Sequence, residues 1–144
     1  MTAKFVSETN SGGVLNGLMV SNTYDGLQRR TGVAVWRNGL LLWGYTNGYD
    51  DASRITSVSD GINSATYYYV ANSSSVDHID FAQNGAFVMR TQNTYDPVNR
   101  LISRVSLAPG TAGTNAPGTT PASFQYQYNA AGQRTRLTLA DGSY

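Results

Sequence analysis

The chain has 144 residues, a formal net charge of +1 and no cysteine. A near-neutral charge gives no general attraction to nucleic acid or to an anionic membrane, and the lack of cysteine excludes disulfides and thiolate metal ligands. No run of 18 apolar residues predicts a membrane span, and the first residues lack the apolar core of a signal peptide. Because the chain ends just past a turn signal, Asp141-Gly142, we expect it to be a fragment of a longer protein.

The choice of charged residues favours an all-β protein. Glu8 is the single glutamate beside eight aspartates, and Lys4 is the single lysine beside nine arginines. Helices favour Glu and Lys, whereas Asp favours turns, and the planar Arg side chain pairs with carboxylates and stacks on rings. Ten tyrosines and fifteen glycines complete a composition typical of strands and tight turns.

The N-terminal half predicts a series of hairpins. Residues 1–13 are polar and are expected to form an irregular segment before a turn at Asn16-Gly17 and a strand at 18–20. A Tyr-Asp turn over 24–30 then precedes strands at 33–37 and 40–45, joined by Asn38-Gly39. The run at 40–45 is apolar on both faces, so we expect both faces to be covered, or one to be adhesive.

The C-terminal half continues the pattern. Strands at 55–59 and 66–70 flank Asp60-Gly61, a loop covers 72–75, and strands at 76–82 and 86–94 flank Asn84-Gly85. Pro97 suits a turn before the strand at 101–107. Residues 108–123 carry three of the four prolines and no charge, which predicts a flexible loop before the last strand pair at 124–128 and 134–140.

Two signals alternate along the chain. Tyr-Asp pairs begin at Tyr24, Tyr49 and Tyr95, with variants at Tyr69 and Tyr128, at spacings of 25, 20, 26 and 33 residues. An Asn-Gly, Asp-Gly or Pro-Gly pair follows each tyrosine after 11 to 15 residues. Since Asn-Gly and Asp-Gly suit two-residue hairpin turns with positive φ at both central positions, each repeat predicts two strands and two reversals.

The repeated Tyr, Asp and Arg are predicted to form a structural motif. The Asp would accept backbone hydrogen bonds within its turn, the Arg would reach that Asp and lie over a Tyr ring, and the tyrosines would form an aromatic row. We expect Tyr49→Ala to destabilise the fold by several kcal/mol. The motif residues are Tyr24, Asp25, Arg29, Tyr49, Asp50, Arg54, Tyr95, Asp96, Arg100, Tyr128 and Arg134.

The pattern resembles the YD-repeat family of bacterial Rhs proteins, toxin-complex shell subunits, wall-associated proteins and teneurins. The segments that carry the resemblance are YDGLQRR, YDDASRI, YDPVNRL and YNAAGQRT, which spread it over residues 16–144. The resemblance implies an antiparallel β-ribbon that spirals into a hollow shell, of which this chain would be one piece, residues 14–144. It also implies a secreted or cell-surface parent protein whose shell encloses a toxin or effector domain.

Few residues suggest chemistry, and we expect no enzyme, no cofactor and no bound metal. His78 and Asp80 share one face of a predicted strand, but a single His without Cys or Glu partners is a poor ligand set. Asp50-Asp51 and the Asp77/Asp80 pair could offer oxygens to calcium, yet no calcium-loop spacing is present. Asp96-Pro97 is similar to the Asp-Pro-x-Gly of the Rhs cleavage region, but Asn99 stands where Gly is needed, so autoproteolysis is not carried over.

Two functions therefore compete. A structural module would pair with other YD repeats of its parent chain and with a cargo domain, and its open strand edges would favour self-association. A carbohydrate or cell-surface binding module would use an aromatic platform at Trp36, Trp43, Tyr45 and Tyr67. The sequence favours the structural module and gives no basic, aromatic groove for nucleic acid.

Overall fold

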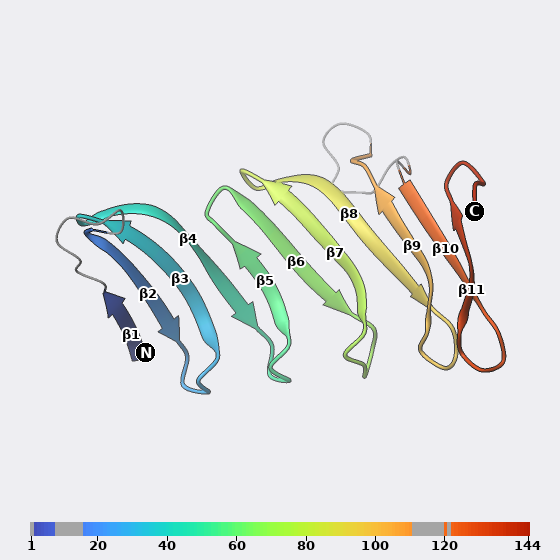
Figure 1. Cartoon of the computed structure of the whole chain (residues 1–144), viewed down its shortest axis with the longest axis horizontal. Coiled ribbons are helices and arrows are strands. Elements are labelled where there is room, and N and C mark those ends of the chain that lie inside the picture. The colour runs from blue at the N-terminus through green and yellow to red at the C-terminus, as the bar shows by residue number, and fades with distance from the viewer. Residues whose placement is uncertain (1, 8–15, 111–119, 121) are drawn as a thin grey trace. The chain divides into compact units, whose positions relative to one another are not determined.

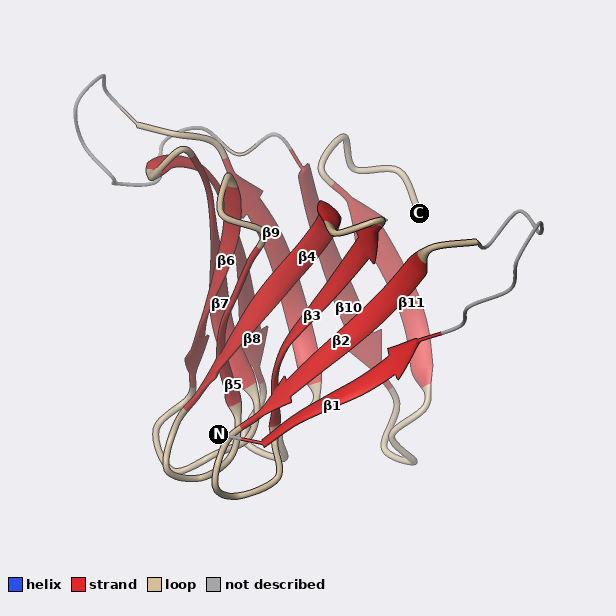
Figure 2. Cartoon of the chain, turned by 90° about the vertical axis from the view of Figure 1, so that its left-hand side faces the viewer, coloured by secondary structure: helices blue, strands red, loops and turns tan. Residues whose placement is uncertain are grey.

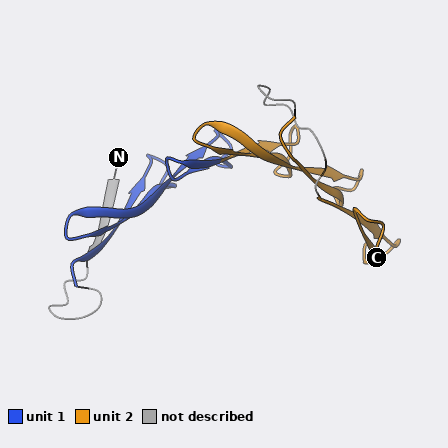
Figure 3. Ribbon diagram, turned by 90° about the horizontal axis from the view of Figure 1, so that it is seen from above, with its two compact units in different colours: residues 1–64 blue, residues 65–144 orange. Residues whose placement is uncertain are grey.

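The structure is a computed structural model that describes residues 2–7, 16–110, 120 and 122–144. Every regular element in these ranges is a strand (Figure 2), which confirms the predicted all-β antiparallel fold. The described residues contain no helix that could cross a membrane. The chain divides into two compact units, residues 1–64 and 65–144 (Figure 3).

The first unit is an antiparallel sheet in which each strand pairs with the next along the chain (Figure 1). Alternating β-branched and aromatic residues favour these extended segments. Its strands are β1 (Thr2–Ser7), β2 (Leu18–Tyr24), β3 (Arg30–Arg37), β4 (Leu40–Tyr49) and β5 (Ile55–Ser59). Strand β6 (Asn63–Tyr69) begins in this unit and ends in the second.

The second unit repeats the arrangement. Strands β7 to β11 pair antiparallel in chain order. Their bounds are β7 (Val76–Gln83), β8 (Ala86–Tyr95), β9 (Leu101–Leu107), β10 (Ala122–Tyr128) and β11 (Arg134–Leu139). In each unit one end of the sheet carries the Tyr-Asp turns and the other carries the Gly-containing hairpin turns.

The Gly-containing turns follow the prediction at two places and differ at two others. Asn38-Gly39 and Asn84-Gly85 have positive φ at both positions, as two-residue type I′ turns require. At Asp60-Gly61 the glycine alone has positive φ (93°), and Asp60 N–H donates to Asn63 O (3.1 Å), so the central pair is 61–62. The Asp60 carboxylate favours this shift, because it accepts the N–H groups of Ile62 and Asn63.

Asp141-Gly142 also departs from the two-residue turn. Leu139 N–H donates to Ser143 O (2.9 Å) and Gly142 N–H donates to Leu139 O (3.0 Å), which makes a three-residue loop with Gly142 at positive φ. The Asp141 carboxylate accepts the Ser143 N–H and hydroxyl. Because of these bonds the left-handed conformation falls on Gly142 alone, and Asp141 is the residue that precedes it.

Two predictions about irregular segments need correction. The N-terminal segment 1–13 contains strand β1, because Thr2–Ser7 pairs with Met19–Tyr24 along the otherwise open edge of β2. The predicted loop 108–123 ends earlier than expected, because β10 begins at Ala122 and pairs with β9. The rest of that loop at 111–119 and 121, and residues 1 and 8–13, lie outside the described residues.

The described residues form no buried apolar core. Among them no large apolar side chain is fully buried, and the one buried polar side chain is Asn93, which is 6% exposed. Leu40, Leu41, Leu42 and Trp43 are each at least half exposed, so the apolar run in β4 is not covered on both faces within this chain. Each unit is thus a single layer of strands, and backbone pairing and the turns carry more of its stability than in a two-layer domain.

Candidate functional site

The Tyr-Asp turns share one backbone shape, which we call the corner: the tyrosine that ends a strand and the five residues that follow it. In the first corner Asp25 N–H donates to Arg29 O (3.0 Å) and Gln28 N–H donates to Asp25 O (3.1 Å). The same pair of bonds recurs at Asp50, Asp96 and Asn129. The fourth residue of each loop has positive φ, as in a type I turn followed by a bulge. These residues are Gln28 (63°), Ser53 (62°), Asn99 (63°) and Gly132 (77°).

The corner Asp holds its own turn together. One oxygen of Asp25 accepts the N–H groups of Leu27 (2.9 Å) and Arg29 (3.0 Å), and the other lies 2.6 Å from Arg29 Nε. Asp50 with Arg54 and Asp96 with Arg100 show the same ion pair, each at 2.7 Å. This sequence spacing therefore places the carboxylate where it satisfies the loop's backbone donors and fixes the arginine.

The surroundings lower the pKa of all three corner carboxyl groups. For Asp50 and Asp96 the strongest cause is the backbone N–H donated by Arg54 or Arg100, which outweighs the opposing effect of burial on the pKa. For Asp25 burial raises the pKa. The hydrogen bonds from the Arg29 backbone and side chain and from the Leu27 backbone together lower it by more, so the net change is downward. The charged form is thus favoured in the folded chain.

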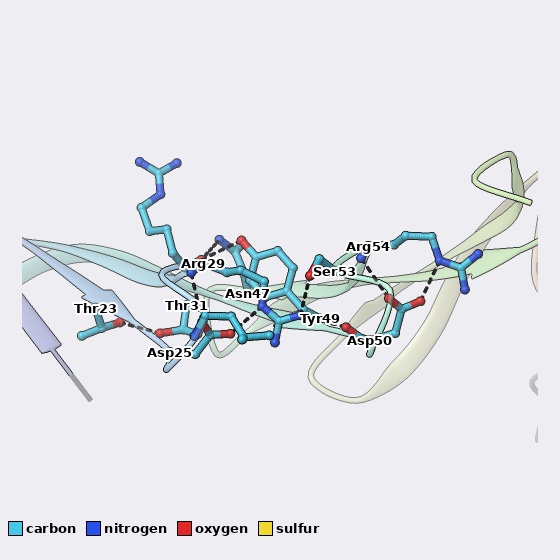
Figure 4. A network of polar contacts seen from close by, with 11 residues as sticks. Thr23, Asp25, Arg29, Thr31, Asn47, Tyr49, Asp50, Ser53 and Arg54 are labelled. Carbon is cyan, nitrogen blue, oxygen red and sulfur yellow. Dashed lines mark hydrogen bonds and ion pairs between the residues drawn. The ribbon is translucent and has the colours of Figure 1, made fainter.

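The corner Arg also contacts the next corner (Figure 4). Arg29 lies 4.9 Å from the centroid of the Tyr49 ring, and its Nη1 donates to Asp50 O (2.8 Å) and Ser53 Oγ (3.2 Å). In the second unit Arg100 lies 4.9 Å from the Tyr128 ring. The guanidinium group therefore bonds to its own Asp and stacks on the tyrosine of the following repeat.

The corner that follows Tyr69 has neither Asp nor Arg, but it contacts the next corner through uncharged side chains. At residues 70–75 Val70 N–H donates to Ser75 O (2.9 Å), so the loop is one residue longer than in the other corners. Ser75 Oγ donates to Asn99 Oδ1 (2.9 Å) in the next corner. The contact between successive corners is thus kept where Asp and Arg are lost.

Three corner tyrosines donate a hydroxyl hydrogen bond to a backbone carbonyl earlier in the chain. Tyr49 bonds to Arg30 O (2.8 Å), Tyr95 to Val76 O (2.9 Å) and Tyr128 to Leu101 O (2.8 Å). Each acceptor is the carbonyl just after the preceding corner. Arginine therefore reaches forward to a tyrosine, and that tyrosine bonds back to the backbone beside the arginine.

An asparagine two residues before the tyrosine was missed by sequence reasoning. Asn47 Nδ2 donates to Arg30 O (2.8 Å) and Asn93 Nδ2 donates to Val76 O (2.9 Å), the same carbonyls that the corner tyrosines use. Asn93 Oδ1 also accepts a hydrogen bond from Arg104 Nε (2.9 Å), so both polar ends of this buried side chain are bonded. The signal was present, since Asn precedes Tyr by two residues at positions 22, 47 and 93.

One predicted corner residue is misplaced. Arg134 was expected to brace the last corner, but Gln133 occupies the position that arginine holds in the others. Asn129 Nδ2 donates to Gln133 Oε1 (2.9 Å), and Asn129 Oδ1 accepts the Gln133 N–H. Arg134 instead lies 4.2 Å from the ring of Tyr126. A neutral pair replaces the ion pair, and the count of five or six residues after Tyr had hidden the difference.

Three of the four residues of the predicted aromatic platform come together. Trp36, Trp43 and Tyr45 line one open groove of about 570 Å³ between β3, β4 and the turn at 59–62. Trp43 and Tyr45 meet edge to face with ring centroids 5.3 Å apart, and Arg30 donates to the Tyr45 hydroxyl (2.9 Å). Tyr67 lies on β6, outside the residues that line this groove.

Three of the residues considered for metal or acid–base chemistry, Asp77, His78 and Asp80, have other partners. His78 Nδ1 lies 2.6 Å from Asp77 Oδ2, and the His78 ring stacks on Tyr68 at 4.2 Å. Asp80 makes two bonds with Arg90, at 2.6 and 2.7 Å, and this bonding raises the pKa of Arg90. Across the described ranges, no three His, Cys, Asp or Glu side chains gather as a metal-binding group.

Fold and site together define an antiparallel β-repeat whose corners are linked in series. No protein-family model and no curated protein matches the sequence. Among solved structures, the chain is similar to one described as the Photorhabdus luminescens Tc holotoxin pore with a mutation in TccC3, at 13% identity and a TM-score of 0.53. The match covers 85% of this chain and 8% of that chain, so the likeness is one of fold over a small part of a larger protein.

The contacts of Tyr49 generate a first prediction. Tyr49→Ala removes the ring under Arg29 and the bond to Arg30 O, and we expect a loss of about 2–3 kcal/mol, below the 3–5 kcal/mol of a fully buried aromatic. Tyr49→Phe keeps the ring and should cost about 0.5–1.5 kcal/mol. Urea denaturation followed by circular dichroism measures both; a loss below 1 kcal/mol for Tyr49→Ala would contradict the role of the corner.

The lowered pKa values generate a second prediction. The folded state holds its corner carboxylates ionised more readily than the unfolded chain, so their contribution to stability is complete above about pH 5. It is lost as the pH falls below about 4 towards the lowered pKa values. We expect the urea concentration at the midpoint of unfolding, followed by circular dichroism, to fall in this pH range. In Asp96→Asn it should fall less. Asp51→Asn, at an exposed neighbour of a corner Asp, is the control and should leave the pH profile unchanged.

Proposed function

We propose that the chain is a non-catalytic structural module, a segment of a YD-repeat shell wall whose parent protein encloses or carries a toxin or effector domain. The observation that supports this most is the forward contact of Arg29 and Arg100 with the next corner. Such a contact is used fully only when another repeat follows. Repeats of this kind bury their surface against neighbours and not within themselves.

The missing core supports the same proposal. Each unit is one layer thick and leaves large apolar side chains such as Leu40 and Trp43 exposed. A wall piece has this property, because the remaining repeats of the wall and its contents supply the other contacts. The fold shared with a Tc holotoxin structure fits a secreted or cell-surface parent protein.

Limited proteolysis of the full-length gene product tests the enclosure. We expect a segment outside the YD repeats to resist trypsin at pH 7 in the intact protein, because the wall separates it from the protease. The matched control is the same segment produced alone, which should be digested at once. Equal digestion of the two samples would contradict a carrier role.

The groove in the first unit favours a second candidate, carbohydrate or cell-surface binding. Trp43 is 53% exposed and meets the Tyr45 ring edge to face, and Trp36 lines the same groove. The polar residues Thr46, Ser59 and Asp60 also line it. Apolar rings with a few polar groups at the side are typical of small-ligand sites.

A glycan array separates the two candidates. If the groove binds sugars, the chain should label particular glycans, and Trp43→Ala should abolish the signal while the circular dichroism spectrum stays the same. Tyr67→Ala, outside the groove, should leave the signal intact. An array without signal would leave the structural module as the function.

A further inference from the structure

Half of strand β4 has an unpaired edge. On the side of β5, the described pairings of β4 are limited to Thr46–Tyr49, because β5 is only five residues long and the chain turns away at 59–62. Residues 40–45 therefore lie along β3 on one side, and residues 41–45 line the groove. We call this part of β4, six residues long, the open edge.

The open edge lacks the features that keep natural strand edges from pairing. Charged residues, prolines and very short strands are the usual protection. The open edge reads Leu-Leu-Leu-Trp-Gly-Tyr, with no charge and no proline. A register shift opposite Val35 and Trp36 makes Leu42 an extra residue and bends the strand, but it adds no charge.

Exposed apolar side chains surround these unpaired backbone groups. Leu40 is 68% exposed, Leu41 51%, Leu42 50% and Trp43 53%, and Ile62 across the groove is 57% exposed. Asp60 is the single charged residue among those that line the groove. A strand added here would gain main-chain hydrogen bonds and bury apolar surface at the same time.

We infer that the open edge binds the same edge of a second copy of the chain, as two antiparallel β4 strands related by a two-fold axis. A two-fold contact needs a surface that complements itself, and an uncharged apolar strand does so without repulsion. The paired strand of each copy would lie beyond the end of the other copy's β5. This contact does not use the corners that support the proposed wall function, since it lies at the opposite end of the sheet.

The open edge offers large apolar side chains to such a dimer. A standard stable interface buries roughly 800 Å² on each partner. Five large apolar side chains at the open edge and across the groove, each at least half exposed, would contribute to this buried surface: Leu40, Leu41, Leu42, Trp43 and Ile62.

The two tryptophans of the chain both line this groove, so intrinsic fluorescence reports on it directly. We expect light scattering to show a dimer that dissociates on dilution, with the tryptophan emission moving to longer wavelength over the same concentration range as water reaches the rings. A monomer at all concentrations would overturn the inference. A dimer whose emission does not change on dissociation would place the contact elsewhere and also overturn it.

A matched pair of variants locates the contact. Leu42→Lys puts a charge into the open edge and should raise the dissociation constant at least about tenfold. Val88→Lys is the control, because Val88 is 47% exposed and is likewise the extra residue at a register shift after an Asn-Gly turn. Equal weakening by both variants would contradict the assignment to β4. If Leu42→Lys loses its circular dichroism spectrum, the dilution experiment on the unmodified chain decides alone.

Discussion

The structure depends on an arginine that serves two repeats at once. Its guanidinium group is fixed by the carboxylate of its own corner and lies against the tyrosine of the next. A single cation–π contact is worth only about 0.5–2 kcal/mol. Here it is combined with the tyrosine hydroxyl bond to the strand beside the arginine. The corners at 24–29 and 49–54, and those at 95–100 and 128–133, are therefore linked by contacts in both directions along the chain.

This arrangement explains how a sheet without a buried apolar core keeps a defined register. A one-residue slip would turn every side chain to the other face, and in most sheets a buried face prevents it. In the described residues no large apolar side chain is fully buried, yet the corner tyrosines end β2, β4, β8 and β10 at equivalent positions. The corners thus fix the strand ends directly, and the faces of the sheet are left available for other contacts.

Much of this architecture could be predicted from the sequence because its signals are local. Asp-x-x-x-Arg places a carboxylate within reach of its own loop, and Asn38-Gly39 specifies a turn by backbone geometry alone. Local counting failed where side-chain bonds compete. The Asp60 carboxylate moved a turn by one residue, and Gln133 rather than Arg134 took the arginine position.

The groove was predicted only in part, since its formation depends on a difference in strand length. The sequence placed Trp36, Trp43 and Tyr45 near one another through the hairpin at 38–39, but the ending of β5 opposite the middle of β4 is a property of strand pairing. The role of Asn47 and Asn93 was missed for a similar reason. Their shared acceptor is a carbonyl on a neighbouring strand, which no short motif reveals.

The spacing between the last two corner tyrosines shows what the linked corners permit. Tyr95 and Tyr128 are 33 residues apart, against 25 for Tyr24 and Tyr49, yet the arginine-to-ring distance is 4.9 Å in both pairs. Additional residues at the far end of the ribbon therefore leave the linked margin unaltered. A gene encoding such a chain can acquire or lose whole surface features there without disturbing its scaffold, and a protein engineer could graft foreign epitopes at the same positions.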